Sequence, residues 1–177
     1  MAIQMPKVFG HPNRLPFDGC LTLIDVPSDK SPGGARGHRV ILTRGAAEAA
    51  LPGLLGMAIS YKDNWSGHDS RQKCGIITGA RIDRDRLLVN GFAYAKDFPE
   101  LARRAAAQDL GMSYELADAH VNDMRAAVWT LTRATFTGAA VLLRTKAAYG
   151  KTNFRMAPAT SHRMALCAGI TGVCNDI

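Results

Sequence analysis

Apolar positions in the first half of the chain fall into short runs of aliphatic and branched side chains, separated by segments rich in Pro, Gly and Ser. Such runs favour β-strands, because branched side chains pack well on a pleated surface. The short polar connection at 83–85 is typical of a hairpin, and the polar segment 62–73 predicts a loop. The pattern predicts strands at residues 20–26, 39–43, 57–61, 74–82 and 86–95.

Three short segments favour helices instead. Thr43 is well placed to cap a helix that runs through Leu51, because its hydroxyl can accept a hydrogen bond from the first helical turn. Pro99 fits the first turn of a second helix, whose apolar stripe begins at Leu101. A third short helix is predicted at 138–146.

The segment 112–121 alternates between two kinds of side chain. Such alternation predicts a half-buried strand, because successive side chains of a strand point to opposite faces of the sheet. Ser113 and Glu115 would then lie on the same face. A further strand is predicted at 126–137.

Many short strands with few short helices predict an α+β fold, either a β-barrel or a curled, mostly antiparallel sheet with a few surrounding short helices. At 177 residues the chain has the length of one domain with a sizeable core. We expect an irregular N-terminal arm at 1–17, where Pro and Gly are frequent, and a single domain at 18–149. The periodicity is lost from residue 150, which predicts a mobile C-terminal tail at 150–177.

Composition narrows the class of protein. No window holds 18 consecutive apolar residues, and the first residues lack a basic-then-apolar signal pattern, so we expect a cytoplasmic protein that does not enter a membrane. The cysteines lack CxxC spacing and a nearby His pair, which predicts free thiols, two of them in or near the core: Cys20, Cys74, Cys167 and Cys174. Neither a metal nor an organic cofactor is predicted.

The net charge of +7 raises the question of a nucleic-acid partner. Lys and Arg are scattered along the chain, whereas nucleic-acid sites usually cluster their charge. The aromatic residues make up 7% and are dispersed, so they do not form a stacking surface on a basic face. We therefore expect a solvated basic surface, and nucleic acid ranks last among the partners considered.

Two short motifs carry candidate chemistry. Gly67-His68-Asp69 lies in the predicted loop before the strand at 74–82, and Ser113 follows Gly111 in the strand at 112–121. A serine hydroxyl is a poor nucleophile at neutral pH unless a neighbouring base takes its proton and a third group orients that base. His68 and Ser113 are the candidates for base and nucleophile.

The order of motifs along roughly residues 57–149 resembles the prohead (capsid maturation) proteases of tailed bacteriophages. In that family a His precedes a strand with a Gly, and a Ser lies in a Met-Ser-aromatic or similar strand after a helix. The matching segments here, in chain order, are Gly67-His68-Asp69, Gly75-Ile76, Gly91-Phe92, Pro99-Glu100 and Gly111-Met112-Ser113-Tyr114-Glu115-Leu116.

The resemblance implies a fold related to the herpesvirus assembly proteases and the activity of a serine endopeptidase, with Ser113 as nucleophile and His68 as general base. It implies phage scaffold and major capsid proteins as substrates, cleavage of the chain itself, and a homo-oligomer acting in the bacterial cytoplasm within the immature head of a phage or prophage. The alternative is a catalytically silent assembly protein of the same fold that binds capsid or scaffold.

The third catalytic member departs from the family pattern, because Arg133 stands where relatives carry a Glu. His120 is the first substitute, since a second imidazole can accept the proton of the first and set its tautomer. Asp118 and Asp123 are the other substitutes, and a turn near Asp118 would be needed to bring His120 to the site. Candidate donors to the oxyanion are left open among three arginines, Arg125, Arg133 and Arg144.

Overall fold

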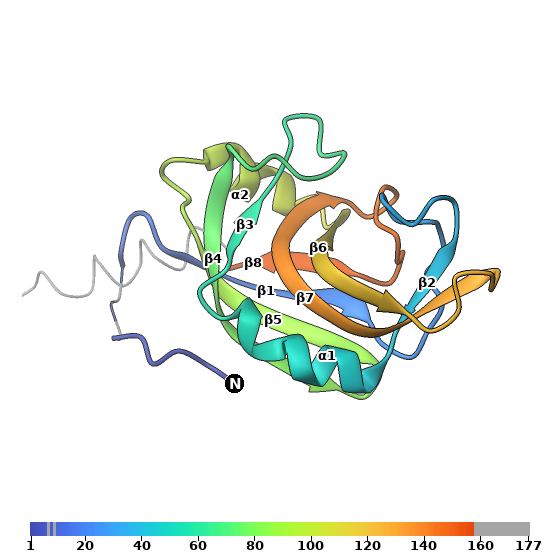
Figure 1. Cartoon of the computed structure of the whole chain (residues 1–177). Helices are drawn as coiled ribbons and strands as arrows, with labels where there is room; N and C mark the ends of the chain where they lie inside the picture. Colours follow the sequence, from blue (N-terminus) through green and yellow to red (C-terminus); the bar gives the residue numbers. More distant parts are fainter. Residues whose placement is uncertain (7, 9, 158–177) are drawn as a thin grey trace, which may run out of the picture.

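The computed structural model describes residues 1–6, 8 and 10–157 of the chain (Figure 1). Its strands form one curled sheet, and short helices lie beside that sheet. In chain order the elements are β1 (Leu15–Leu23), β2 (Arg39–Leu42), α1 (Arg44–Ala50), the 3-10 helix η1 (Leu51–Leu54), β3 (Ala58–Ser60), β4 (Lys73–Asp83), β5 (Arg86–Ala93), α2 (Pro99–Ala105), β6 (Leu110–Val121), β7 (Val128–Leu143) and β8 (Asn153–Met156).

The sheet has the order β2-β7-β3-β4-β5-β1-β8, and β6 pairs with β7 outside this path. Only the pairings of β7 with β2 and β3 are parallel among the described strands, and the others are antiparallel. The long strand β7 pairs with β6 along one edge, and with β2 and then β3 along the other. The curled, mostly antiparallel sheet with few short helices is therefore confirmed.

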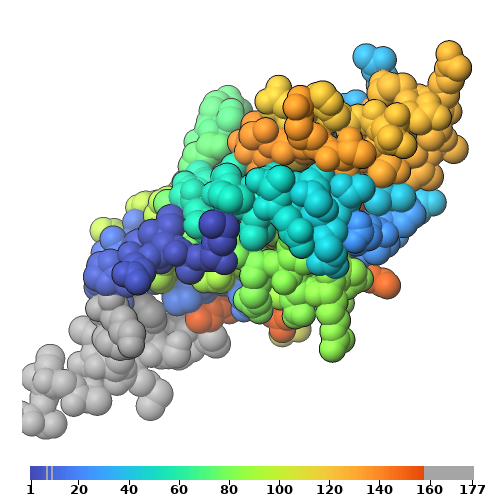
Figure 2. Space-filling view, turned by 60° about the horizontal axis from the view of Figure 1, so that its bottom comes forward, coloured from blue at the N-terminus to red at the C-terminus, as the bar shows by residue number. Residues whose placement is uncertain are grey.

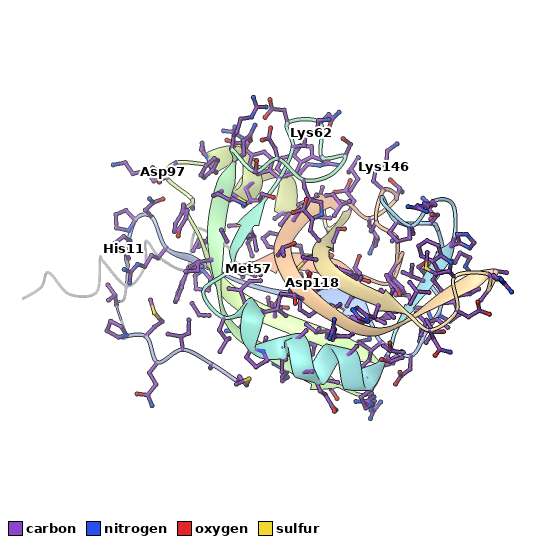
Figure 3. The ribbon with its side chains drawn as sticks, in the orientation of Figure 1. His11, Met57, Lys62, Asp97, Asp118 and Lys146 are labelled. Carbon is purple, nitrogen blue, oxygen red and sulfur yellow. The ribbon has the colours of Figure 1, made fainter. Side chains whose placement is uncertain are left out.

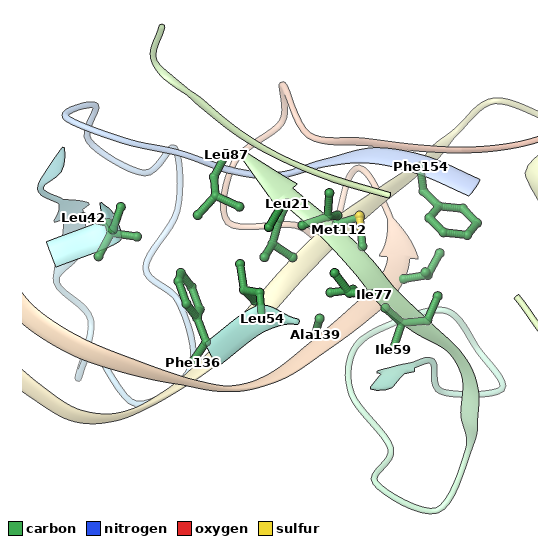
Figure 4. Packing of buried hydrophobic residues seen from close by; sticks show 14 of the residues in the cluster. Leu21, Leu42, Leu54, Ile59, Ile77, Leu87, Met112, Phe136, Ala139 and Phe154 are labelled. Atoms are coloured by element: carbon green, nitrogen blue, oxygen red, sulfur yellow. The ribbon is translucent and has the colours of Figure 1, made fainter. Parts of the chain in front are cut away.

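The core lies inside the curl of the sheet, where side chains from opposite strands meet (Figure 4). Met112 of β6 packs against β1 at Gly19, where a Cβ would come within 2.6 Å of the Met112 sulfur. A Cβ at 19 would also come within 2.7 Å of the Asn153 carbonyl oxygen of β8, so a larger residue there would force the backbone of β8 or the Met112 side chain to shift. The largest fully buried side chains include Leu21, Leu42, Leu54, Ile59, Ile77, Leu87, Met112 and Phe154.

Local sequence signals account for both short helices. Thr43 caps α1 as predicted, and its hydroxyl accepts a hydrogen bond from the Ala46 N–H at 3.3 Å. The same hydroxyl donates to the Leu131 carbonyl of β7 at 2.9 Å, so the cap also ties the helix to the sheet. Pro99 occupies the first turn of α2, where its missing N–H costs no helical hydrogen bond.

The helix predicted at 138–146 is wrong, because β7 continues to Leu143. Its Ala-rich sequence has good helix propensity, but this part of the strand pairs with β6 on one edge and with β3 on the other. Residues 139–142 are all buried between these neighbours. Pairing and burial on both edges outweigh the local preference for a helix.

The described segments on both sides of the predicted domain contain more regular structure than predicted. Strand β1 already begins at Leu15, and the Ala80 N–H donates to the Met1 carbonyl at 2.9 Å, so that the first residues lie along β4 on the molecular surface (Figure 2). Residues 153–156 form β8, which pairs with β1, so a tail starting at residue 150 is wrong there. The rest of the predicted tail, 158–177, lies outside the described residues.

Cys20 and Cys74 are free and buried, as expected for two of the thiols, and Cys167 and Cys174 lie outside the described residues. Burial raises the pKa of the Cys74 thiol to about 12, so this side chain behaves as a small apolar group. Among the described residues no helix has both the length and the apolar character needed to cross a membrane.

Candidate functional site

His68 lies on the loop between β3 and β4, in the polar segment where a loop was predicted. The loop is fastened to the end of β7, because the Trp65 carbonyl accepts a hydrogen bond from the Leu143 N–H at 2.8 Å. The Trp65 ring stacks on Tyr61 with centroids 4.6 Å apart. These contacts hold the loop beside β7, the strand that pairs with β6.

A set of hydrogen bonds also holds the loop directly after His68. The Asp69 carboxylate accepts hydrogen bonds from the Arg71 N–H at 2.9 Å and from the Arg71 guanidinium at 2.9 and 3.1 Å. These bonds lower the pKa of Asp69 to about 2, so the carboxylate stays ionised throughout the neutral range. The hydrogen bonds and ion pair of Asp69 given by the structure all join it to Arg71, within its own loop.

Ser113 and Glu115 lie on β6, which pairs antiparallel with β7. Ser113 is opposite Ala140 and Glu115 is opposite Gly138, so the two side chains share one face of the sheet, as the alternation predicts. The Glu115 carboxylate folds over Gly138, where an added Cβ would collide with Oε2. A glycine at 138 leaves room for that carboxylate.

His68 reaches this face of β6 from its loop. Its Nδ1 lies 3.4 Å from Glu115 Oε1, although Nδ1 makes no aligned hydrogen bond. The His68 side chain is 19% exposed and the Glu115 side chain 54% exposed. The more exposed Glu115 carboxylate therefore faces Nδ1 of the largely buried His68 imidazole.

Burial lowers the pKa of His68 below its ordinary value, because the surrounding protein disfavours the charged imidazolium. The negative charge of Glu115 opposes this effect and raises the pKa, while the positive charge of Lys73 lowers it further. The net direction is downward. His68 is thus neutral at pH 7 and able to accept a proton.

Ser113 and His68 line the same cavity, whose volume is about 880 Å³. The cavity also borders the Gly-rich loop 30–36, the turn 144–148 after β7, and parts of β6 and β7. The loop that carries His68, near the label of Lys62, and the turn that carries Lys146 lie on the same side of the molecule (Figure 3). His68 and Ser113, which the sequence analysis proposed as base and nucleophile, therefore both border this one cavity.

The three predicted substitutes for the third member do not meet His68. His120 is exposed and its Nε2 contacts the Arg133 guanidinium. Asp118 and Asp123 are also exposed, and the Asp123 carboxylate accepts a hydrogen bond from the Arg125 N–H at 2.8 Å. The backbone turns at Asp118, with a φ of 50°, but this irregularity in β6 does not bring His120 to the cavity lining.

Glu115 is the carboxylate that faces His68, and it was not among the candidates proposed from the sequence. The available signal was its spacing, because a residue two positions after the serine on a strand must share its face. The three arginines considered as oxyanion donors, Arg125, Arg133 and Arg144, are not among the described residues that line the cavity.

Chemically, the site offers a serine hydroxyl and a neutral imidazole in one cavity, with a carboxylate behind the imidazole. In the part of the chain that the structure describes, no three His, Cys, Asp or Glu side chains group in a way that could hold a metal ion. Comparison with protein-family models gave no match, and comparison with curated proteins gave none either.

Proposed function

We propose that this chain is a serine endopeptidase with Ser113 as nucleophile, His68 as general base and Glu115 as the group that orients His68. One observation carries the proposal: His68 shares a cavity with Ser113 while its Nδ1 faces the Glu115 carboxylate. His68 and Ser113 come from segments about 45 residues apart in sequence, and their presence in one cavity lining supports the proposal.

The chemistry follows from this placement. Because Glu115 favours a proton on Nδ1 of His68, the lone pair is left on Nε2, which takes the proton of the Ser113 hydroxyl as its oxygen attacks a peptide carbonyl. The imidazolium formed is stabilised by the Glu115 carboxylate and then gives its proton to the leaving amine. Water hydrolyses the resulting ester with His68 again as base, which restores the serine.

The setting of this activity is proposed from the resemblance to phage prohead proteases. In that setting the substrates are scaffold and major capsid proteins inside an immature head in the bacterial cytoplasm, and the enzyme also cleaves its own chain. A homo-oligomer is part of the same proposal. Two features support the resemblance on which this setting rests: the curled sheet, and the order in which the elements that carry His68 and Ser113 follow each other along the chain.

A catalytically silent assembly protein is the second candidate. Two observations favour it: His68 Nδ1 makes no aligned hydrogen bond, and Arg133 stands where the prohead proteases carry a Glu. Such a protein would keep the fold and bind capsid or scaffold without hydrolysing it.

A serine-reactive biotinylated phosphonate separates the two candidates. We expect the wild type to gain one adduct at Ser113, and the variants Ser113→Ala and His68→Ala to gain none. Ser70→Ala is the matched control, because Ser70 is an exposed serine of the same loop as His68. Intact-mass spectra of wild type and Ser113→Ala also test self-cleavage, which predicts a shortened chain in the wild type alone.

The absence of any adduct on a folded wild type would support the silent protein. An adduct that persists in Ser113→Ala would place the nucleophile elsewhere and overturn the proposed site.

A further inference from the structure

The cavity extends well beyond Ser113 and His68. Its lining follows β6 from Ser113 to Val121, and Val121 pairs with Leu131 of β7. The eight residue-to-residue steps from Ser113 to Val121 correspond to roughly 25 Å along the chain, at about 3.3 Å per step, and the curl of the sheet shortens the straight path. The hollow is thus a cleft that has room for several residues of an extended peptide.

The end of the cleft away from Ser113 is apolar. We call its lining the apolar end, and it consists of Val40, Val121, Met124, Trp129 and Leu131. Val40 of β2 and Trp129 of β7 are paired across the two strands. The indole N–H of Trp129 donates a hydrogen bond to the Met124 carbonyl at 3.2 Å, which ties the turn after β6 to this end. Met124 is 52% exposed, so its side chain is accessible to an apolar group bound at this end.

The rim of the cleft is basic. Three exposed cations line it, and we call Lys30, Arg36 and Lys146 the basic rim. The two segments that carry them are joined, because the Lys30 ammonium donates to the Thr145 carbonyl. Glu115, which faces His68, is the one carboxylate among the described residues of the lining. The neighbouring Asp29 accepts a hydrogen bond from Gly150 and does not line the cleft.

We infer that the cleft selects peptide segments that combine a large apolar side chain with acidic side chains. The apolar side chain is buried at the apolar end, and the acids lie along the basic rim, where opposite charge favours them and repels lysine or arginine. This inference rests on the proposed function, because a peptidase needs an extended peptide in the cleft that holds its serine. It adds the substrate class that the catalytic residues do not define.

Binding to full-length Ser113→Ala tests the inference without hydrolysis. The probes are fluorescein-labelled peptides of ten residues in a Gly/Ser background, in four classes: Leu with two Glu, Leu with two Lys, Asn with two Glu and Asn with two Lys. The spacing between the two kinds of residue is scanned in each class. We expect the Leu/Glu class to contain the tightest binders by fluorescence anisotropy, at least tenfold tighter than the best of each other class.

Second substitutions in the Ser113→Ala protein assign the preference to the cleft. Lys146→Glu should weaken the Leu/Glu peptides and reduce or reverse their advantage over Leu/Lys peptides. Arg103→Glu makes the same change of charge at an exposed position outside the lining and should have no such effect. Met124→Ser should reduce the advantage of Leu over Asn while leaving the preference for Glu.

Equal binding of the four classes, or an equal effect of Arg103→Glu and Lys146→Glu, would overturn the inference. Its failure is distinct from that of the proposed function. Selective binding by a protein whose wild type gains no phosphonate adduct leaves the cleft preference standing and refutes the peptidase. A Ser113 adduct together with unselective peptide binding would support the peptidase and overturn the cleft preference.

Discussion

The protonation state of His68 depends on a balance between burial and charge. Burial lowers the pKa of the imidazole, and the carboxylate of Glu115 at 3.4 Å partly restores it. A general base must be unprotonated at the working pH and yet basic enough to take a proton from serine. Glu115 therefore keeps the pKa of His68 from falling further, and in the proposed mechanism it also orients the ring.

The pH dependence of activity tests both effects. We expect kcat/KM of the wild type to rise with pH as His68 loses its proton, with a midpoint below 6.5 because its pKa is lowered. Glu115→Gln removes the charge that raises this pKa, so the midpoint should move to still lower pH. The plateau should fall by roughly 10²-fold, because the imidazolium loses its stabilising carboxylate.

The measurements are a pH–rate profile with a peptide substrate and an NMR titration of the His68 ring. Glu48→Gln is the matched control, since Glu48 is an exposed acid on α1 away from the cavity. A midpoint that stays in place in Glu115→Gln would show that this carboxylate does not act on His68.

At the scale of elements, the β6–β7 ladder builds the face on which Ser113 and Glu115 lie. The register shifts between Glu115 and Leu116, and this bulge lies directly beyond the pair formed by Glu115 and Gly138. Bulges redirect side chains and are common beside functional sites. The absence of a side chain at 138 allows the carboxylate to fold back across β7 toward His68.

Gly138→Ala therefore acts on the site through Glu115. The new methyl group would meet the far end of the flexible Glu115 side chain and no backbone atom, so we expect the free energy of unfolding to change by less than about 1 kcal/mol. The displaced carboxylate should lower kcat nearly as much as Glu115→Gln does. Chemical denaturation and steady-state kinetics measure the two quantities.

The double variant Gly138→Ala/Glu115→Gln shows whether the two residues act together. If they do, its kcat should be close to that of Glu115→Gln alone, because the interaction is already lost. Independent, multiplicative losses would argue that Gly138 affects the site by another route. Gly91→Ala is a contrasting variant, because its Cβ would collide with the Ile76 carbonyl and should destabilise the fold itself.

At the scale of the whole molecule, the chain returns after β7 and adds β8 beside β1. Phe154 of β8 is 1% exposed, and its ring lies 5.1 Å from that of Phe17 in β1, centroid to centroid. The preceding Thr152 hydroxyl accepts a hydrogen bond from the Met112 N–H at 3.3 Å, one residue before Ser113. The last described strand thus supports the strand that carries the candidate nucleophile.

Phe154→Ala should lower the free energy of unfolding by about 3–5 kcal/mol, the usual cost of removing a fully buried phenylalanine. Met156→Ala on the same strand is the control, and it should cost less because Met156 is only partly buried. Urea denaturation measures both. A small effect of Phe154→Ala would mean that β8 contributes little to the core.

Features that depend on near neighbours along the chain could be predicted from the sequence. The hairpin of β4 and β5, the Thr43 cap, and the common face of Ser113 and Glu115 follow from turn residues, a capping hydroxyl and alternation, all of which act within a few residues. The sequence also provided the candidates His68 and Ser113, through the order of their motifs.

Contacts between residues far apart in the chain could not be predicted in this way and are set by the fold. It extended β7 through a segment of good helix propensity, paired β8 with β1, and put Glu115 in contact with His68 while His120 contacts Arg133. Each outcome depends on strand pairing and register between segments far apart in the chain. Such pairings add burial and hydrogen bonds that outweigh local propensity, and no local pattern encodes them.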